Sequence, residues 1–293
     1  MEVLTDPYSW WLDPFVSNPF MRNALWVGLL VVLSTSVVGT WVVLRGMSFL
    51  GDALAHGVLP GIAVAFILGI NTSLGAFVAA LVMVLGVNLI RAHSPLPEDT
   101  SVGVLFVGFL ALAVVLMSHH SAGYAGDLNR FLFGSIIAVD NGDLLRQGAA
   151  ALVSLLGVAL FFRAFLVLTF DETQARLLGL RPRLAHGVLL VLLTVSIVGS
   201  FEAVGSLLVF AFLVAPPASA ALLVRRVPVI MMLSVGLGSI SVVVGLLISY
   251  HAATATSATM ALVSVAIFVA VLVANSVHSF VVSALAAREI SAC

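Results

Sequence analysis

The chain has 293 residues and a mean hydropathy of +1.23, with 62% of its residues hydrophobic and 9% charged. A soluble globular domain has about 25% charged residues, so this composition excludes one and predicts a protein that crosses a membrane many times. The net charge of −1 gives no reason to expect a nucleic-acid partner. The one cysteine, Cys293, excludes an internal disulfide and a cysteine-based metal cluster.

Apolar runs about 20 residues long, the length that crosses a bilayer as a helix, fill most of the chain. They predict an all-α polytopic membrane protein with about nine spans (eight or nine), which form a single transmembrane domain over residues 1–293. The spans are expected at about 23–44, 48–68, 72–90, 102–117, 147–168, 187–200, 205–224, 228–250 and 258–284.

Two stretches are not expected to span. Residues 1–21 are acidic and aromatic, not basic, which disfavours a secretory signal and favours an interfacial segment anchored by Trp10 and Trp11. The apolar stretch 131–139 is too short to cross a bilayer and predicts a re-entrant or interfacial piece.

Arginine placement predicts the orientation. The chain has no lysine, and nine of its 12 basic residues lie on one side of the predicted membrane. Cytoplasmic loops are enriched in positive charge, so we expect the amino terminus outside and the carboxyl terminus in the cytoplasm.

One predicted span contains an ionisable pair, because Asp52 and His56 lie four residues apart near the start of 48–68. This spacing places both side chains on one helical face. A charge inside the membrane costs about 2.5–3.5 kcal/mol on insertion scales, so such residues usually mark a functional site. A carboxylate and an imidazole together can bind a divalent transition metal. The alternative is a hydrogen-bonded pair that joins helices, with Ser36 or Ser48 as a partner.

Several further polar or helix-breaking residues are candidates for a role. Pro60 and Gly61 are expected to break the helix that contains the ionisable pair. His119, His120 and Glu202 are expected on the outer side, where they could receive a metal ion. The plainer interpretation is that these three are solvated loop residues.

The polar stretch 170–186 is expected on the cytoplasmic side. Asp171 and Glu172 at its start and Gly179 near its end indicate a short capped helix, with three leucines forming an apolar side. Such a helix could dock a soluble partner or could lie on the lipid surface as an ordinary loop helix.

Five stretches of the chain, taken in order, match a known pattern. They are VVLRGMSFLGDALAHGVLPGIAVAF (42–66), EDTSVGVLF (98–106), DLNRFLFGSIIAV (127–139), FDETQARLLGL (170–180) and VGSLLVFAFLVAPPASAALL (204–223). Together they resemble the membrane subunit of ATP-binding-cassette importers for zinc and manganese, the ABC-3 metal permease family. The resemblance extends from Pro19 to about Phe280, and the first and fourth stretches are the most specific.

The resemblance implies a type II-importer-like permease in a bacterial plasma membrane, which moves zinc, or manganese as the second choice, by alternating access. It implies a homodimer of the permease, two cytoplasmic ATP-binding-cassette ATPase subunits and an extracytoplasmic metal-binding solute-binding protein. The transported ion is cargo, and no permanently bound cofactor is expected.

The resemblance also assigns roles to residues. It places Asp52 and His56 on the ion path, and it implies that 170–180 is the coupling helix that contacts the ATPase. The residues expected in that coupling role are Phe170, Asp171, Glu172, Ala175 and Gly179. Two departures are visible: Ala55 replaces the serine of the family's DALSH-type motif, and 251–260 lacks the family's Pro-x-Gly element.

The chain has no GxxxxGK[ST] loop and no lysine to serve one, so it is not expected to be an enzyme, and a separate subunit must hydrolyse ATP. Three rival functions remain. An ion-coupled secondary transporter would often show an inverted repeat, and none is obvious. A permease for a metal chelate, haem or another organic substrate would be indifferent to Asp52→Asn. A non-transporting scaffold would fit poorly with a buried ionisable pair.

Overall fold

The structure is a computed structural model that describes residues 7–95, 97–120, 134, 136, 139–170 and 181–291. Within these residues, nine helical segments are long and apolar enough to cross a membrane, as the sequence predicts. They are Pro19–Leu44, Ser48–Leu68, Thr72–Ile90, Asp99–Ser118, Gly142–Phe170, Leu184–Phe201, Ala203–Leu223, Val227–Ala252 and Thr256–Val277.

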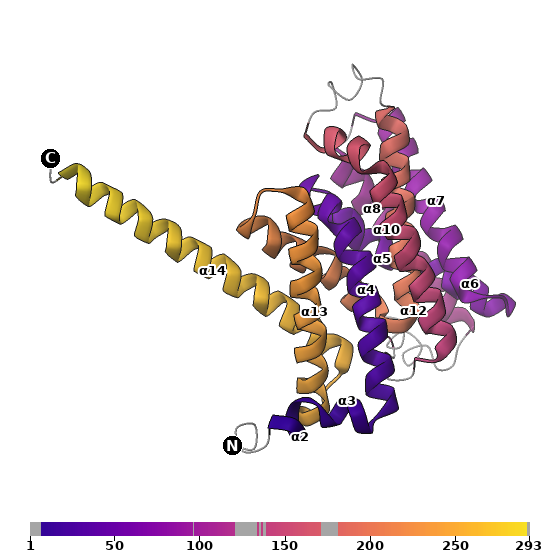
Figure 1. Cartoon of the computed structure of the whole chain (residues 1–293). Helices are drawn as coiled ribbons and strands as arrows, with labels where there is room; N and C mark the ends of the chain where they lie inside the picture. The colour runs from indigo at the N-terminus through magenta and orange to yellow at the C-terminus, as the bar shows by residue number, and fades with distance from the viewer. Residues whose placement is uncertain are drawn as a thin grey trace.

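The helices form one bundle from which the last helix extends (Figure 1). Two short helices, α2 and α3, precede the first span, and α14 runs outward from the end of α13. The element bounds are α2 (Pro7–Trp11), α3 (Asp13–Ser17), α4 (Pro19–Leu44), α5 (Ser48–Gly57), α6 (Leu59–Leu68), α7 (Thr72–His93), α8 (Glu98–His120), α10 (Asn141–Phe170), α12 (Pro182–Leu223), α13 (Val227–Ala252) and α14 (Thr256–Ser291).

Helix α4 packs against α10, α12 and α13. Small residues allow this close packing: a Cβ on Gly39 would collide with the carbonyl oxygen of Leu213 in α12. Trp41 is fully buried near the end of α4, where its ring contacts those of Phe162 and Phe165 edge-on at 5.4 and 5.6 Å between centroids. Because lipid is as apolar as leucine, such close backbone approach and ring packing hold membrane helices together.

The second span is divided into α5, which ends at Gly57, and α6, which begins at Leu59. Pro60 lies in the first turn of α6, where a missing backbone N–H costs nothing. Gly61 is helical, and a Cβ there would collide with the carbonyl oxygen of Gly75 in α7. The structure therefore gives Gly61 a packing role between two helices that the local sequence did not indicate.

Helix α12 contains a break at Gly205, whose φ of 77° and ψ of 164° are not helical. The break lies at the start of the predicted seventh span, 205–224, and just inside the apolar segment Ala203–Leu223. Gly134 also has a positive φ, of 64°, and lies against the break, where a Cβ would collide with the backbone of Val204 and Gly205. Both positions suit glycine, because any other residue would be strained at a positive φ. Of the predicted re-entrant stretch 131–139, only residues 134, 136 and 139 are described.

Candidate metal-binding site

The structure places Asp52 and His56 on one face of α5. Asp52 Oδ1 lies 3.6 Å from His56 Nε2, and the two side chains are 28% and 23% exposed. His56 Nδ1 is buried and has no hydrogen-bond partner among the described residues. The pair therefore has both a partly open side and unused ligand capacity.

Apolar side chains surround this pair. The Phe106 ring of α8 lies 5.9 Å from the His56 ring, and Phe49 packs edge-on against Phe106 at 6.2 Å between centroids. The Ser36 hydroxyl has no hydrogen-bond partner in the described part of the chain, so it does not tie Asp52 or His56 to α4. These contacts make a polar pair in a mostly apolar setting, where a bound cation would be strongly favoured over bare charge.

Ala55 is fully buried, whereas Asp52 and His56 are partly exposed. The serine that the family motif has at this position would therefore lie in the packed side of α5. Alanine at this position leaves no hydroxyl in that helix interface and leaves the Asp52 and His56 side chains unaffected.

The number of ligands from one chain is small. Within the described residues, no group of three or more His, Cys, Asp or Glu side chains lies close enough to hold a metal ion. Asp52 and His56 could together offer one or two oxygens and one nitrogen, fewer than the four ligands of a closed zinc site. Any further ligands must come from water, from undescribed residues or from another chain.

The remaining predicted residues are only partly visible. Phe170 is the last residue of α10 and is 68% exposed. The other coupling candidates lie outside the described residues: Asp171, Glu172, Ala175 and Gly179. The backbones of three outer candidates lie in α8 and α12, but their side chains are outside what the structure describes: His119, His120 and Glu202.

Sequence reasoning missed a second polar site inside the membrane. The Gln147 side chain of α10 is fully buried, and its amide donates hydrogen bonds to Ser34 Oγ at 3.1 Å and Ser200 Oγ at 3.2 Å. These residues come from α4, α10 and α12, so one amide links three helices. The signal in the sequence was a lone glutamine within an apolar run.

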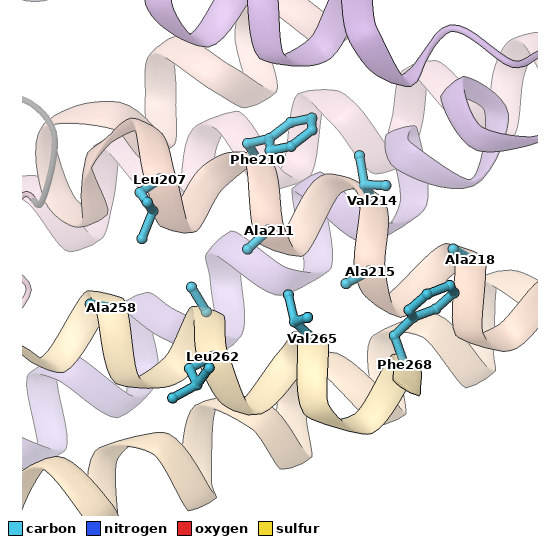
Figure 2. A pocket seen from close by; sticks show the side chains of 11 residues that line it. Leu207, Phe210, Ala211, Val214, Ala215, Ala218, Ala258, Leu262, Val265 and Phe268 are labelled. Atoms are coloured by element: carbon cyan, nitrogen blue, oxygen red, sulfur yellow. The ribbon is translucent and has the colours of Figure 1, made fainter. Parts of the chain in front are cut away.

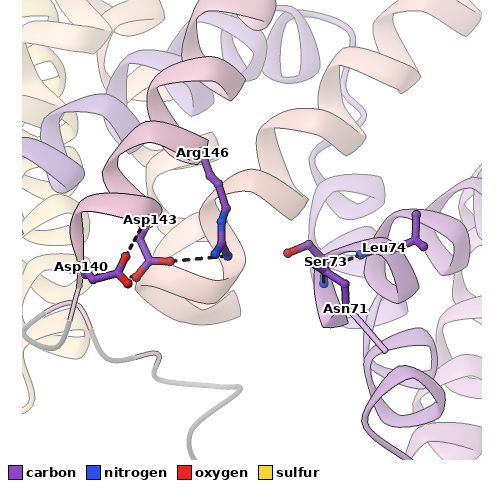
Figure 3. A network of polar contacts seen from close by, with 6 residues as sticks. All are labelled: Asn71, Ser73, Leu74, Asp140, Asp143 and Arg146. Carbon is purple, nitrogen blue, oxygen red and sulfur yellow. Dashed lines mark hydrogen bonds and ion pairs between the residues drawn. The ribbon is translucent and has the colours of Figure 1, made fainter. Parts of the chain in front are cut away.

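The acidic residues at the start of α10 form a helix cap (Figure 3). The Asp143 N–H donates to Asp140 Oδ1 at 2.8 Å, and the Asp140 N–H donates to Asp143 Oδ2 at 3.2 Å. The backbone N–H of Asp143 holds the pKa of Asp140 below its ordinary value of 3.8. Arg146 pairs with Asp143 at 3.7 Å. This cluster caps a helix and shows no metal-site geometry.

An apolar groove lies between the second half of α12 and α14 (Figure 2). It has a volume of about 500 Å³ and is lined by alanine, leucine, valine and phenylalanine side chains, among them Phe210, Ala211 and Val265. Because it offers no side-chain oxygen, nitrogen or sulfur ligand, the groove is not the ion site.

Comparison with known proteins identifies close relatives. The model of the ABC 3 transport family matches residues 17–275. The Manganese transport system membrane protein MntC of Listeria innocua is 36% identical over 257 residues, which cover 88% of this chain and 91% of that protein. The Manganese import system permease protein ScaB of Streptococcus parasanguinis is 37% identical over 257 residues, with the same coverage of 88% and 91%.

The fold also matches a solved structure. That structure is PsaBC from Streptococcus pneumoniae in complex with Fab, with a TM-score of 0.81 and 33% sequence identity. The match covers 89% of this chain and 94% of the other.

Proposed function

Because this chain belongs to the ABC 3 transport family and is the membrane permease of a metal importer, we propose that Mn²⁺ is its cargo and that Asp52 and His56 bind the ion on its way through the membrane. One observation supports the site most directly: the two side chains lie 3.6 Å apart, partly exposed, in an apolar span. Both relatives described above are named for manganese, and neither name supports zinc, the sequence's first choice.

The chemistry of the pair suits a transported ion. Carboxylate oxygen and imidazole nitrogen are both ligands for Mn²⁺, and they also admit Fe²⁺ and Zn²⁺. Two ligands from one chain hold an ion more weakly than a closed site would, which favours its release. We propose that two copies of the permease face each other across the path, so that the second copy supplies the same pair.

The energy for transport comes from another protein in this proposal. The chain has no phosphate-binding loop and no lysine to serve one, so two ATPase subunits hydrolyse ATP on the cytoplasmic side. The segment 170–180 joins the exposed end of α10 to the start of α12, and this is where the ATPase docks. An extracytoplasmic binding protein delivers the ion, and the spans alternate between outward and inward access.

The test is ATP-driven uptake of radioactive Mn²⁺ by proteoliposomes that contain the permease with its ATPase. Asp52→Asn and His56→Ala are each expected to lower uptake by about 100-fold, because each removes a direct ligand. The matched controls are Asp99→Asn and His93→Ala, which change exposed residues at helix ends and should leave uptake unchanged.

The outcomes separate the alternatives. Normal uptake by both site variants would overturn the site, and the pair would then be a structural contact. Uptake of Zn²⁺ or Fe²⁺ in preference to Mn²⁺ would overturn the choice of metal alone. If the wild-type protein moves none of these ions, an organic or chelated substrate replaces the metal ion as the cargo.

A further inference from the structure

A polar contact joins two distant helix ends near the proposed coupling segment. Arg45 Nη1 lies 3.2 Å from His186 Nδ1, across 141 residues of sequence. Arg45 is the C-cap of α4, and His186 lies near the start of α12. We propose that Arg45 and His186 are positioning residues that link the coupling segment to the helix that bears Asp52 and His56. This inference rests on the proposed function.

On one side of the contact, the turn from α4 to α5 is stiff. The Gly46 N–H donates to Val43 O at 3.0 Å, and the Met47 N–H donates to Val42 O at 2.9 Å. Gly46 has a φ of 67°, which completes a Schellman turn. Helix α5 begins two residues after Gly46, at Ser48, so Asp52 lies only about one helical turn further on. A displacement of Arg45 is therefore transmitted to α5 through a closed, hydrogen-bonded turn.

On the other side, α12 begins directly after the coupling segment. Its first residue is Pro182, and His186 follows about one turn later. Because a helix moves as a stiff body over such a short distance, a pull on 170–180 moves His186. Helix α12 also contacts α5 directly, since a Cβ on Gly51 would collide with the side chain of Leu213. The Arg45–His186 contact thus joins the start of α12 to the turn between α4 and α5. Further along its length, α12 also packs directly against both of these helices.

The chemistry of the contact fixes the charge of His186. A guanidinium group has only donors, so His186 Nδ1 must be the acceptor, and the ring must be neutral with its proton on Nε2. Protonation would remove the acceptor and place two positive charges 3.2 Å apart.

The test is the amount of Mn²⁺ or Zn²⁺ moved per ATP hydrolysed by the complete transporter in proteoliposomes. Arg45→Ala and His186→Ala should each lower this ratio by about 5-fold or more while ATP hydrolysis continues, because coupling between sites typically corresponds to 5–150-fold effects. His186→Asn keeps an acceptor near the Nδ1 position and should retain the wild-type ratio. His93→Ala is the matched control, since its imidazole contacts only the Leu89 carbonyl of its own helix among the hydrogen bonds described.

One further readout distinguishes positioning from simple packing. The double variant Arg45→Ala/His186→Ala should lower the ratio by less than the product of the two single losses, because both substitutions remove the same contact.

Any of three results would overturn the link: a normal ratio in His186→Ala, an equal loss in His186→Asn and His186→Ala, or multiplying losses in the double variant. The proposed function is judged separately. If Asp52→Asn transports normally while His186→Ala is uncoupled, the ion site is wrong and the link stands.

Discussion

Two polar sites in the described membrane-spanning helices differ in charge, in exposure and in the number of helices that they join. Asp52 and His56 are ionisable, partly exposed and short of ligands. Gln147 is neutral, fully buried, and bonded through its amide nitrogen to hydroxyls of two other helices. Burial favours neutral groups with partners, whereas an ionisable pair persists only where an opening or a cation offsets its cost. The comparison indicates cohesion at Gln147 and favours the proposed ion-handling role of Asp52 and His56.

The largest effect is expected at Asp52, where a substitution should greatly lower transport and hardly change the stability of the fold. Asp52→Asn should lower Mn²⁺ uptake by about 100-fold and change the free energy of unfolding by less than about 0.5 kcal/mol, because the side chain is partly exposed. Thermal unfolding of the purified permease in lipid nanodiscs measures the second quantity. A large loss of stability would show that Asp52 is a structural residue and would remove the contrast with Gln147.

The opposite pattern is expected at Gln147. Gln147→Leu should destabilise the permease by about 1–3 kcal/mol, because it leaves the buried Ser34 and Ser200 hydroxyls without their donor. The matched control is Leu145→Ala on the same helix, where the side chain is 77% exposed and its loss should change little. Equal unfolding temperatures for Gln147→Leu and the control would contradict the cohesive role.

A packing substitution in the second span tests whether its stability comes from helix contacts. Gly61→Ala should destabilise by about 1–3 kcal/mol, because the added methyl group meets the Gly75 carbonyl of α7. Gly108→Ala is the matched control in α8, where a Cβ meets nothing within 4 Å. In chemical unfolding, Gly61→Ala should have a lower denaturant midpoint than Gly108→Ala. Similar midpoints would show that the close approach of Gly61 and Gly75 does not stabilise the α6–α7 contact.

The smallest effect is expected at the cap that Asp140 and Asp143 form at the start of α10. The pKa of Asp140 is lowered when the protein folds, mainly by the Asp143 N–H, so its ionised form stabilises the fold. This contribution is complete above the ordinary value of 3.8 and is lost as the pH falls through the lower pKa of the folded protein. Asp140→Asn should therefore lower the unfolding temperature slightly at pH 7, and this difference from the wild type should shrink in acid. A difference in unfolding temperature that grows in acid would contradict a stabilising role for the ionised Asp140 side chain.

Span length and hydropathy made most of the fold predictable. The third span was expected at 72–90 and is helical over Thr72–His93, because the bilayer sets its length and Asn71 caps its start. Helix α14 continues to Ser291, beyond the expected end of the last span at 284. Hydropathy cannot locate that end, because a helix can continue beyond the membrane where its residues favour the helical conformation.

The two polar sites were not equally predictable. Asp52 and His56 are neighbours on one helix, so their spacing alone indicated a shared face. The role of Gln147 depends on Ser34 and Ser200, which lie 113 and 53 residues away in sequence. Such partners are set by how helices pack, and a hydropathy pattern holds no information about them. The metal-binding role of Asp52 and His56 stays a prediction.

Pulsed electron paramagnetic resonance of Mn²⁺ bound to the intact transporter tests the central claim most directly, because it detects nitrogen atoms bonded to the ion. We predict a nitrogen coupling in the wild type that is lost in His56→Ala and kept in His93→Ala. A coupling that persists unchanged in His56→Ala, or its absence from the wild type, would contradict the assignment of His56 as a metal ligand.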